Sequence, residues 1–183
     1  MSGLEAAWAA LAAGRDAEAL ALAEGCLDEL MEAADGDPGA LDADQVAAAV
    51  EALEVEGEVA IRLEDAADRR EDSQAAVEDL VGLGEKFEAL CLVVRGAASA
   101  EDWPTASTAY LALGSLAGEP RRGAHDDRRH RVLPALAAGR ALIAQGATAA
   151  AREVLAPLGD DPEATTLLLA LLANPTGGPA ALS

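Results

Sequence analysis

Arginine and histidine are concentrated in one short stretch of the chain, residues 121–131. Five of the twelve arginines and both histidines lie within these eleven residues. Guanidinium groups bind carboxylates and phosphates through paired hydrogen bonds, so the stretch is typical of a docking site for an acidic peptide, a phosphorylated segment or an anionic ligand. An internal clamp on acidic helices and a plain solvated loop are the alternatives. The candidate contact residues are Arg121, Arg122, His125, Arg128, Arg129, His130 and Arg131.

The same stretch is poorly suited to metal binding or catalysis. Asp126 and His130 are four residues apart and would share a helix face, but the neighbouring arginines oppose a cation. The sequence contains no Glu-x-x-His pair, no Gly-x-Ser-x-Gly turn, no phosphate-binding glycine-rich loop and no catalytic cysteine motif beside a histidine. We therefore predict no catalytic residues, no metal and no cofactor.

Three further side chains are candidates for a functional role because of their chemical type. Trp8, near the N-terminus, could anchor a partner or a second copy of the chain, or could pack on the next helix. Cys26 and Cys91 lie in apolar stretches outside any metal-binding spacing. We interpret both cysteines as small core residues of a protein in a reducing compartment.

The net charge of −20 is unevenly distributed. Residues 1–60 hold 15 acidic residues against Arg15 alone, residues 61–120 have a net charge of −7, and residues 121–183 have a net charge of +1. An acidic surface repels phosphate and anionic lipid, so we expect neither nucleic acid nor membrane as a partner. The acidic body could bind a basic partner. It could also serve only solubility or reflect adaptation to high salt.

Two observations predict a soluble, cytoplasmic protein. The N-terminal residues 1–5 contain no basic segment of the kind that begins a signal peptide. The longest apolar run, residues 167–173, is too short to span a bilayer.

The apolar residues predict an all-α fold. The chain contains 47 alanines and 27 leucines but only one Phe and one Tyr, and alanine and leucine are strong helix formers. Turn signals divide the chain into about seven or eight helices, including 4–13, 42–70, 85–98, 104–118, 134–145, 148–156 and 164–173. Within 42–70 we interpret Glu51, Glu54 and Glu58 as a solvated helix face. Residues 174–183, rich in Gly and Pro, are predicted to be a disordered tail.

Pro134 allows two interpretations. Either one long helix kinks at this residue or a new helix begins with Pro134 in its first turn, and we favour the new helix.

A turn followed by a small residue recurs at 14–20, 101–107 and 146–152. This pattern resembles the tetratricopeptide repeat, which pairs two helices through such a turn. The matching residues are Gly14, Asp16, Ala19, Ala23 and Cys26, then Gly96, Asp102, Trp103, Ala106 and Tyr110, then Gly139, Gly146, Ala151 and Leu155. The match covers about half the chain. Its small residues are 87 and 45 positions apart, whereas the repeat has about 34.

The resemblance implies a right-handed stack of antiparallel helical hairpins with a peptide-binding groove, closed by the helix 164–173. An irregular helical bundle is the alternative. We predict one domain over residues 1–173, with an acidic body over 1–120 and a neutral-to-basic region over 121–173.

The expected function is a non-catalytic protein–protein interaction module that binds a protein or peptide. Either the arginines of 121–131 would recognise acidic groups or the acidic face of residues 42–88 would recognise basic ones. Alternatives are an enzyme or small-ligand protein with a pocket near His125 and His130, and an acidic mimic of DNA. A homodimer is compatible with the sequence.

Overall fold

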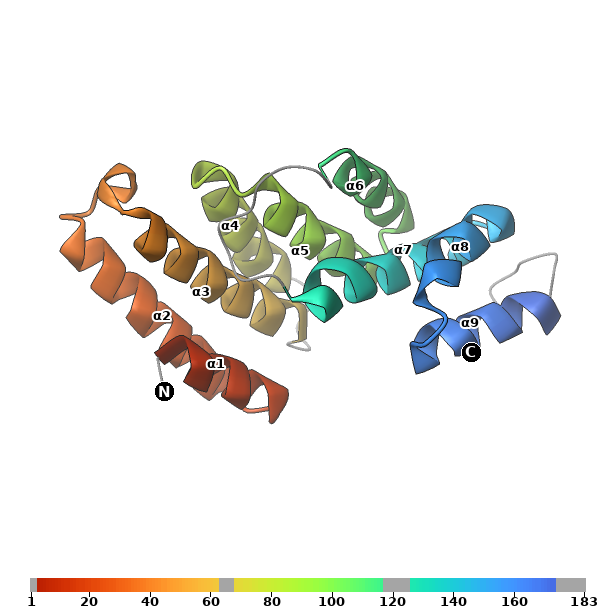
Figure 1. The fold of residues 1–183 in the computed structure, drawn as a ribbon, viewed down its shortest axis with the longest axis horizontal. Coiled ribbons are helices and arrows are strands. Elements are labelled where there is room, and N and C mark those ends of the chain that lie inside the picture. The colour runs from red at the N-terminus through yellow and green to blue at the C-terminus, as the bar shows by residue number, and fades with distance from the viewer. Residues whose placement is uncertain (1–2, 63–67, 117–125, 174–183) are drawn as a thin grey trace. The chain divides into compact units, whose positions relative to one another are not determined.

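A computed structural model describes residues 3–62, 68–116 and 126–173, and their regular elements are all helical. The nine α-helices are α1 (Gly3–Ala12), α2 (Asp16–Ala33), α3 (Ala43–Arg62), α4 (Asp68–Gly82), α5 (Lys86–Ser99), α6 (Trp103–Ser115), α7 (Leu133–Ala144), α8 (Thr148–Leu155) and α9 (Pro162–Ala173) (Figure 1). Three short helices complete the described part: η1 (Pro38–Ala40), η2 (Arg128–Val132) and η3 (Ala156–Leu158). The predicted all-α class is confirmed. None of the described helices is long and apolar enough to cross a bilayer.

The prediction of one helix over residues 42–70 was wrong. Helix α3 ends at Arg62, and α4 begins at Asp68. The sequence between them is rich in charge and contains no glycine or proline, so it carries no stop signal that could have separated the two helices. The expected tail, 174–183, lies outside the described residues.

Four helical hairpins are closed by the same turn. The turn residue has a left-handed backbone in each hairpin: Gly14 (φ 71°), Gly84 (φ 87°), Glu101 (φ 56°) and Gly146 (φ 75°). The next residue donates its N–H to a carbonyl five positions back: Arg15 to Ala10 (2.9 Å), Glu85 to Leu80 (2.8 Å), Asp102 to Ala97 (2.8 Å) and Ala147 to Leu142 (2.8 Å). This bond satisfies a carbonyl that the helix end leaves open.

An alanine five residues after each turn residue is buried. These four alanines are Ala19, Ala89, Ala106 and Ala151, and none is more than 2% exposed. The turns at Gly14, Glu101 and Gly146 are those predicted from the sequence. The turn at Gly84 was not among the three turns matched to the repeat, although the helix expected over 85–98 begins directly after it.

The described residues form two compact units, 3–92 and 93–116 with 126–173, and the boundary falls within α5. Whether the two form the single predicted domain stays a prediction. In the first unit, α3 packs against α1, α2 and α4 (Figure 1). One apolar cluster joins α1, α2 and α3, and another joins α3, α4 and the first half of α5. Helix α3 is therefore covered on most sides.

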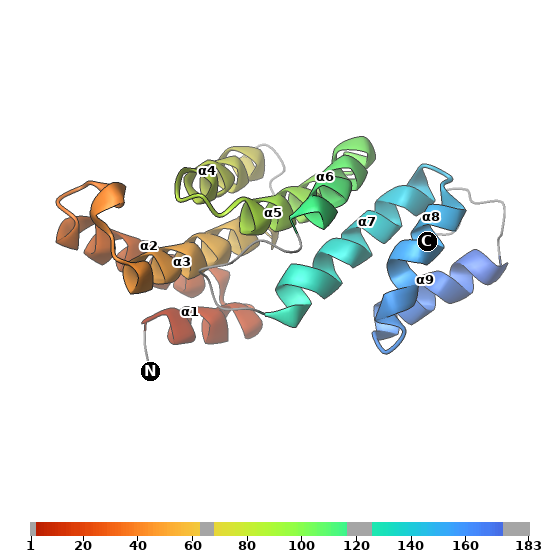
Figure 2. The same cartoon turned by 45° about the horizontal axis from the view of Figure 1, so that its top comes forward.

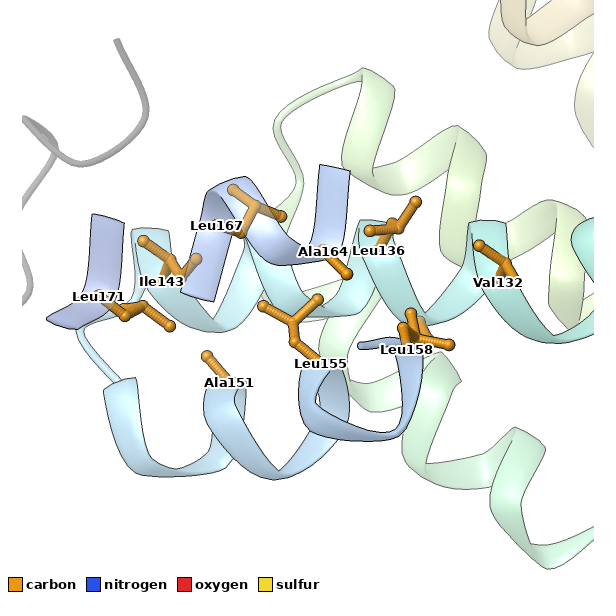
Figure 3. Close-up of a cluster of buried hydrophobic side chains, with 10 residues drawn as sticks. Val132, Leu136, Ile143, Ala151, Leu155, Leu158, Ala164, Leu167 and Leu171 are labelled. Carbon is orange, nitrogen blue, oxygen red and sulfur yellow. The ribbon is translucent and has the colours of Figure 1, made fainter. Parts of the chain in front are cut away.

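In the second unit, α7 occupies the central position and packs against α6, α8 and α9 (Figure 2). Side chains of α7, α8 and α9 meet in one core, in which Leu155, Ala164 and Leu171 are fully buried (Figure 3). The helix expected over 164–173 is present as α9. It buries Ala164, Leu167 and Leu171 along one face.

The structure around Pro134 combines features of both interpretations. Helix α7 begins at Leu133 with Pro134 in its first turn, but η2 precedes it without a break. Leu133 donates its N–H to the carbonyl of Arg128, five residues back rather than four. This wider turn accommodates a proline ring, which in a regular helix would clash with the carbonyl four residues earlier.

Two glycines let helices approach closely. A Cβ at Gly57 on α3 would lie 2.5 Å from Cδ1 of Leu92, and one at Gly139 on α7 would lie 2.6 Å from Cδ2 of Leu155. Both leucines are buried, so neither side chain has space to move away. In contrast, a Cβ at Gly25 on α2 would meet no atom within 4 Å.

We expect Gly57→Ala to lower the free energy of unfolding by about 1–2 kcal/mol, because overpacking outweighs the gain of about 1 kcal/mol in helix propensity. The matched variant Gly25→Ala should raise it by about 0.5–1 kcal/mol, because only the propensity changes. Urea denaturation followed by circular dichroism measures both. Equal stabilisation by the two variants would contradict the close approach at Gly57.

Candidate functional site

The structure describes four of the seven predicted contact residues in 121–131. Arg121, Arg122 and His125 lie outside the described residues. Arg128, Arg129, His130 and Arg131 lie on η2, immediately before α7. The acidic residues that contact these four residues are described below.

Asp126 organises the start of this helical segment. Its carboxylate accepts the backbone N–H of Arg129 at 2.8 Å, and its own N–H donates to Nδ1 of His130 at 3.2 Å. The imidazole is 3% exposed. Nδ1 of His130 thus accepts a hydrogen bond at the start of the helix, which is a structural role.

Two arginines pair with acids in the same segment, and a third pairs with the turn before α9. Arg131 makes two hydrogen bonds to Asp127, 2.7 Å from Nε to Oδ1 and 2.9 Å from Nη2 to Oδ2. This pairing raises the pKa of the Arg131 guanidinium. Arg129 lies 3.7 Å from Asp126, and Arg128 lies 3.4 Å from Asp161.

These pairs join acids of the same segment and of the turn before α9, not acids of the earlier helices that an internal clamp would use, so the choice among docking site, clamp and solvated loop stays a prediction. Ion pairs in which at least one partner is exposed contribute little net free energy, so they position the arginines more than they stabilise the fold. Recognition of an external acidic group by Arg128, Arg129, His130 or Arg131 stays a prediction. An external acid would have to compete with carboxylates already in place.

The predicted solvated face of α3 is wrong for Glu54 and Glu58. Both side chains are buried, as are Glu85 and Glu88 in the same unit. The physical reason is the central position of α3, which covers the second face of the helix as well as the first. Among the described residues, no three His, Cys, Asp or Glu side chains are grouped so that they could hold a metal ion.

A line of exposed acidic residues lies on α2. We define the acidic strip as Glu24, Asp28, Glu29 and Glu32, all exposed. Glu24, Asp28 and Glu32 follow one another at intervals of four residues, so they lie along one line of the helix. Within the described part of the chain, no basic side chain forms an ion pair with the strip. Arg15 instead pairs with Glu18 and Arg62 with Asp16.

The acidic strip was not predicted, because the acidic face was expected between residues 42 and 88. A signal was present: Leu20, Ala23, Leu27 and Leu30 mark the apolar stripe of α2, and the acids between them must face the other way.

Trp8 is partly buried against the cluster formed by α1, α2 and α3. This packing agrees with the alternative in which Trp8 contacts the next helix. Its use as an anchor for a partner stays a prediction.

Cys26 lies on the same helix as the acidic strip and is half-buried. Burial raises the pKa of its thiol, and the negative charges of Glu29 and Glu51 raise it further. A raised pKa keeps the thiol protonated at neutral pH, so Cys26 is not an activated nucleophile.

Comparison with known proteins gives no family for the chain, since no family model matches it and neither a curated protein nor a solved structure is detectably similar.

Asp161 has two roles: its carboxylate pairs with Arg128, and it caps the start of α9. Substitutions at Asp161 and Arg128 distinguish how much each role contributes to the free energy of unfolding. The Asp161 carboxylate accepts the N–H groups of Glu163 (2.9 Å) and Ala164 (3.1 Å) at the start of α9. We expect Asp161→Ala to lower the free energy of unfolding by about 1–2 kcal/mol, because both acceptor bonds are lost. Asp161→Asn keeps the acceptor and should cost less than about 0.5 kcal/mol.

The control for this pair is Arg128→Ala, which removes only the ion pair and should also change the free energy of unfolding by less than about 0.5 kcal/mol. Urea denaturation measures all three variants. If Arg128→Ala costs as much as Asp161→Ala, the ion pair dominates and our assignment of Asp161 as a cap is wrong.

The thiol of Cys26 reports on the charge of the acidic strip. In a Cys91→Ala background, we expect slow labelling by a disulfide reagent at neutral pH and faster labelling as the pH rises, because only the thiolate reacts. Glu29→Gln removes one negative charge and should increase the labelling rate at each pH below the thiol pKa. An unchanged rate–pH profile would show that Glu29 does not act on Cys26.

Proposed function

We propose that this chain is a non-catalytic interaction module built from helical hairpins, and that the acidic strip on α2 binds a basic segment of a partner protein. The single observation that carries the proposal is the strip itself: four exposed carboxylates on one helix, without a basic counterpart among the described residues.

The hairpin construction supports a binding role of the tetratricopeptide kind. The same turn and the same buried alanine recur in four hairpins, as they do in arrays that stack helical pairs into a binding surface. The irregular spacing of the four turns implies a degenerate version of that design. A right-handed stack of these hairpins is part of the proposal.

Charge favours the acidic strip over the arginines of η2 as the recognition surface. Arg128, Arg129 and Arg131 each have an acidic neighbour within the unit, whereas the strip carries unbalanced charge. Unbalanced surface charge attracts an oppositely charged partner and increases its rate of association. The strip can therefore recognise a partner without first losing an internal contact.

The length of the strip indicates the kind of partner. From Glu24 to Glu32 it extends about 12 Å, at about 1.5 Å per residue. That length suits two or three turns of a helix with lysine or arginine at intervals of four residues. It is about a third of one turn of DNA, about 34 Å, so a short basic segment fits better than the role of a DNA mimic.

The proposal is tested with three forms of the full chain as bait in a lysate: the unchanged chain, Glu24→Lys/Asp28→Lys/Glu32→Lys, and a control. The control, Asp79→Lys/Glu153→Lys/Asp160→Lys, reverses the same number of exposed acids elsewhere. We expect a basic protein to bind the unchanged chain and the control but not the strip variant. With that protein purified, the strip variant should bind at least about tenfold more weakly at low salt.

The dependence of the binding affinity on salt concentration provides a second test of the proposal. Binding through exposed charges weakens as the Debye length falls from about 10 Å at 0.1 M to about 3 Å at 1 M salt. The same captured proteins with all three baits would contradict the proposal, as would a partner whose affinity does not change with salt.

A further inference from the structure

The outward face of α9 carries exposed leucines. Leu169 is 60% and Leu172 is 67% exposed, while the opposite face buries Ala164, Leu167 and Leu171 in the core. Leu169 and Leu172 are three residues apart, so they lie side by side on one face of the helix. The outward face of a helix normally carries polar side chains, because that face meets water. We propose that the outward face of α9 is a dimer interface, covered by α9 of a second copy of this chain.

The local charge favours a second copy. The only charged residue within α9 is Glu163, and it forms an ion pair with Arg140. Residues 121–183 have a net charge of +1, whereas the chain as a whole has −20. Two copies of so acidic a chain repel each other over most of their surface, and the repulsion is smallest where the charge is balanced.

The geometry of a helix pair also suits self-association. A two-fold axis beside α9 would place the same two leucines of each copy against each other, in the self-complementary arrangement of a symmetric dimer. Antiparallel α9 helices would also set opposite ends of their dipoles together.

The ten residues after α9 in this sequence offer little apolar surface to cover this face. Residues 174–183 contain one large apolar side chain, Leu182, together with two prolines and two glycines. Helix α9 of a second copy would instead place its own Leu169 and Leu172 against Leu169 and Leu172 of the first copy.

The size of the contact predicts a weak dimer. One helix of twelve residues from each copy forms an interface at the small end of specific interfaces, below about 1,200 Å² in total. We therefore expect a monomer–dimer equilibrium in the micromolar range or weaker. This inference is independent of the acidic strip, so the binding of a basic partner neither supports nor contradicts it.

Sedimentation equilibrium of the full chain, from about 10 to about 500 µM, tests the proposal. The apparent mass should rise from 18.5 kDa toward twice that value. Leu169→Glu/Leu172→Glu should stay monomeric, with a dissociation constant at least about tenfold higher, because it places four like charges together. The matched control is Leu111→Glu on α6, where the leucine is 78% exposed, and it should dimerise like the unchanged chain.

Each of the other outcomes overturns the proposal. A chain that remains monomeric at the highest concentration has no such interface, whatever the variants do. If Leu169→Glu/Leu172→Glu dimerises like the unchanged chain, the contact lies elsewhere. The same holds if Leu111→Glu abolishes dimerisation to the same extent. If the chain ending at Ala173 dimerises but the full chain does not, residues 174–183 cover the face instead. Circular dichroism confirms that each variant keeps its helical content.

Discussion

Close approach of helix backbones is the constraint on which the rest of this structure depends. The chain has one Phe, one Tyr and two Trp, so large rings cannot fill the space between its helices. Small residues remove the space instead: alanine at the same position after four turns, and glycine at 57 and 139 where a leucine of another helix occupies the site of a Cβ. The left-handed turns keep paired helices in the register that makes this contact. Packing at native density then requires each small residue to stay small.

A core of this kind places unusual demands on its central helices. Helix α3 has neighbours on more than one side, so it must be buried around most of its circumference, and Glu54 and Glu58 are buried with it. Helix α7 has the same position in the second unit, but its buried side chains are apolar or small. The outer helices α2 and α9 each bury a single stripe. Their other faces are free of packing constraints.

Local signals predicted the helices well and their surroundings poorly. Glycine located the turns at Gly14 and Gly146, because the left-handed conformation is a property of the turn residue itself. The break between α3 and α4 has no such signal. The burial of Glu54 was unpredictable for another reason: a helical pattern identifies one apolar face, whereas burial of the second face depends on neighbours distant in sequence. The pairing of Arg128 with Asp161, 33 residues away, is equally non-local.

The composition of the outward faces of α2 and α9 is not determined by the fold, and both proposals rest on it. Both helices meet the same folding requirement, a stripe of alanine and leucine on the inside, and neither needs a particular outer face to satisfy it. Neutral drift under a requirement for solubility would give both an ordinary mixture of polar side chains. Instead α2 carries four unbalanced carboxylates, and α9 carries two exposed leucines and a single charge near its start. The two surfaces differ from the ordinary mixture in opposite directions, which is the reason for proposing two different contacts, one electrostatic and one apolar.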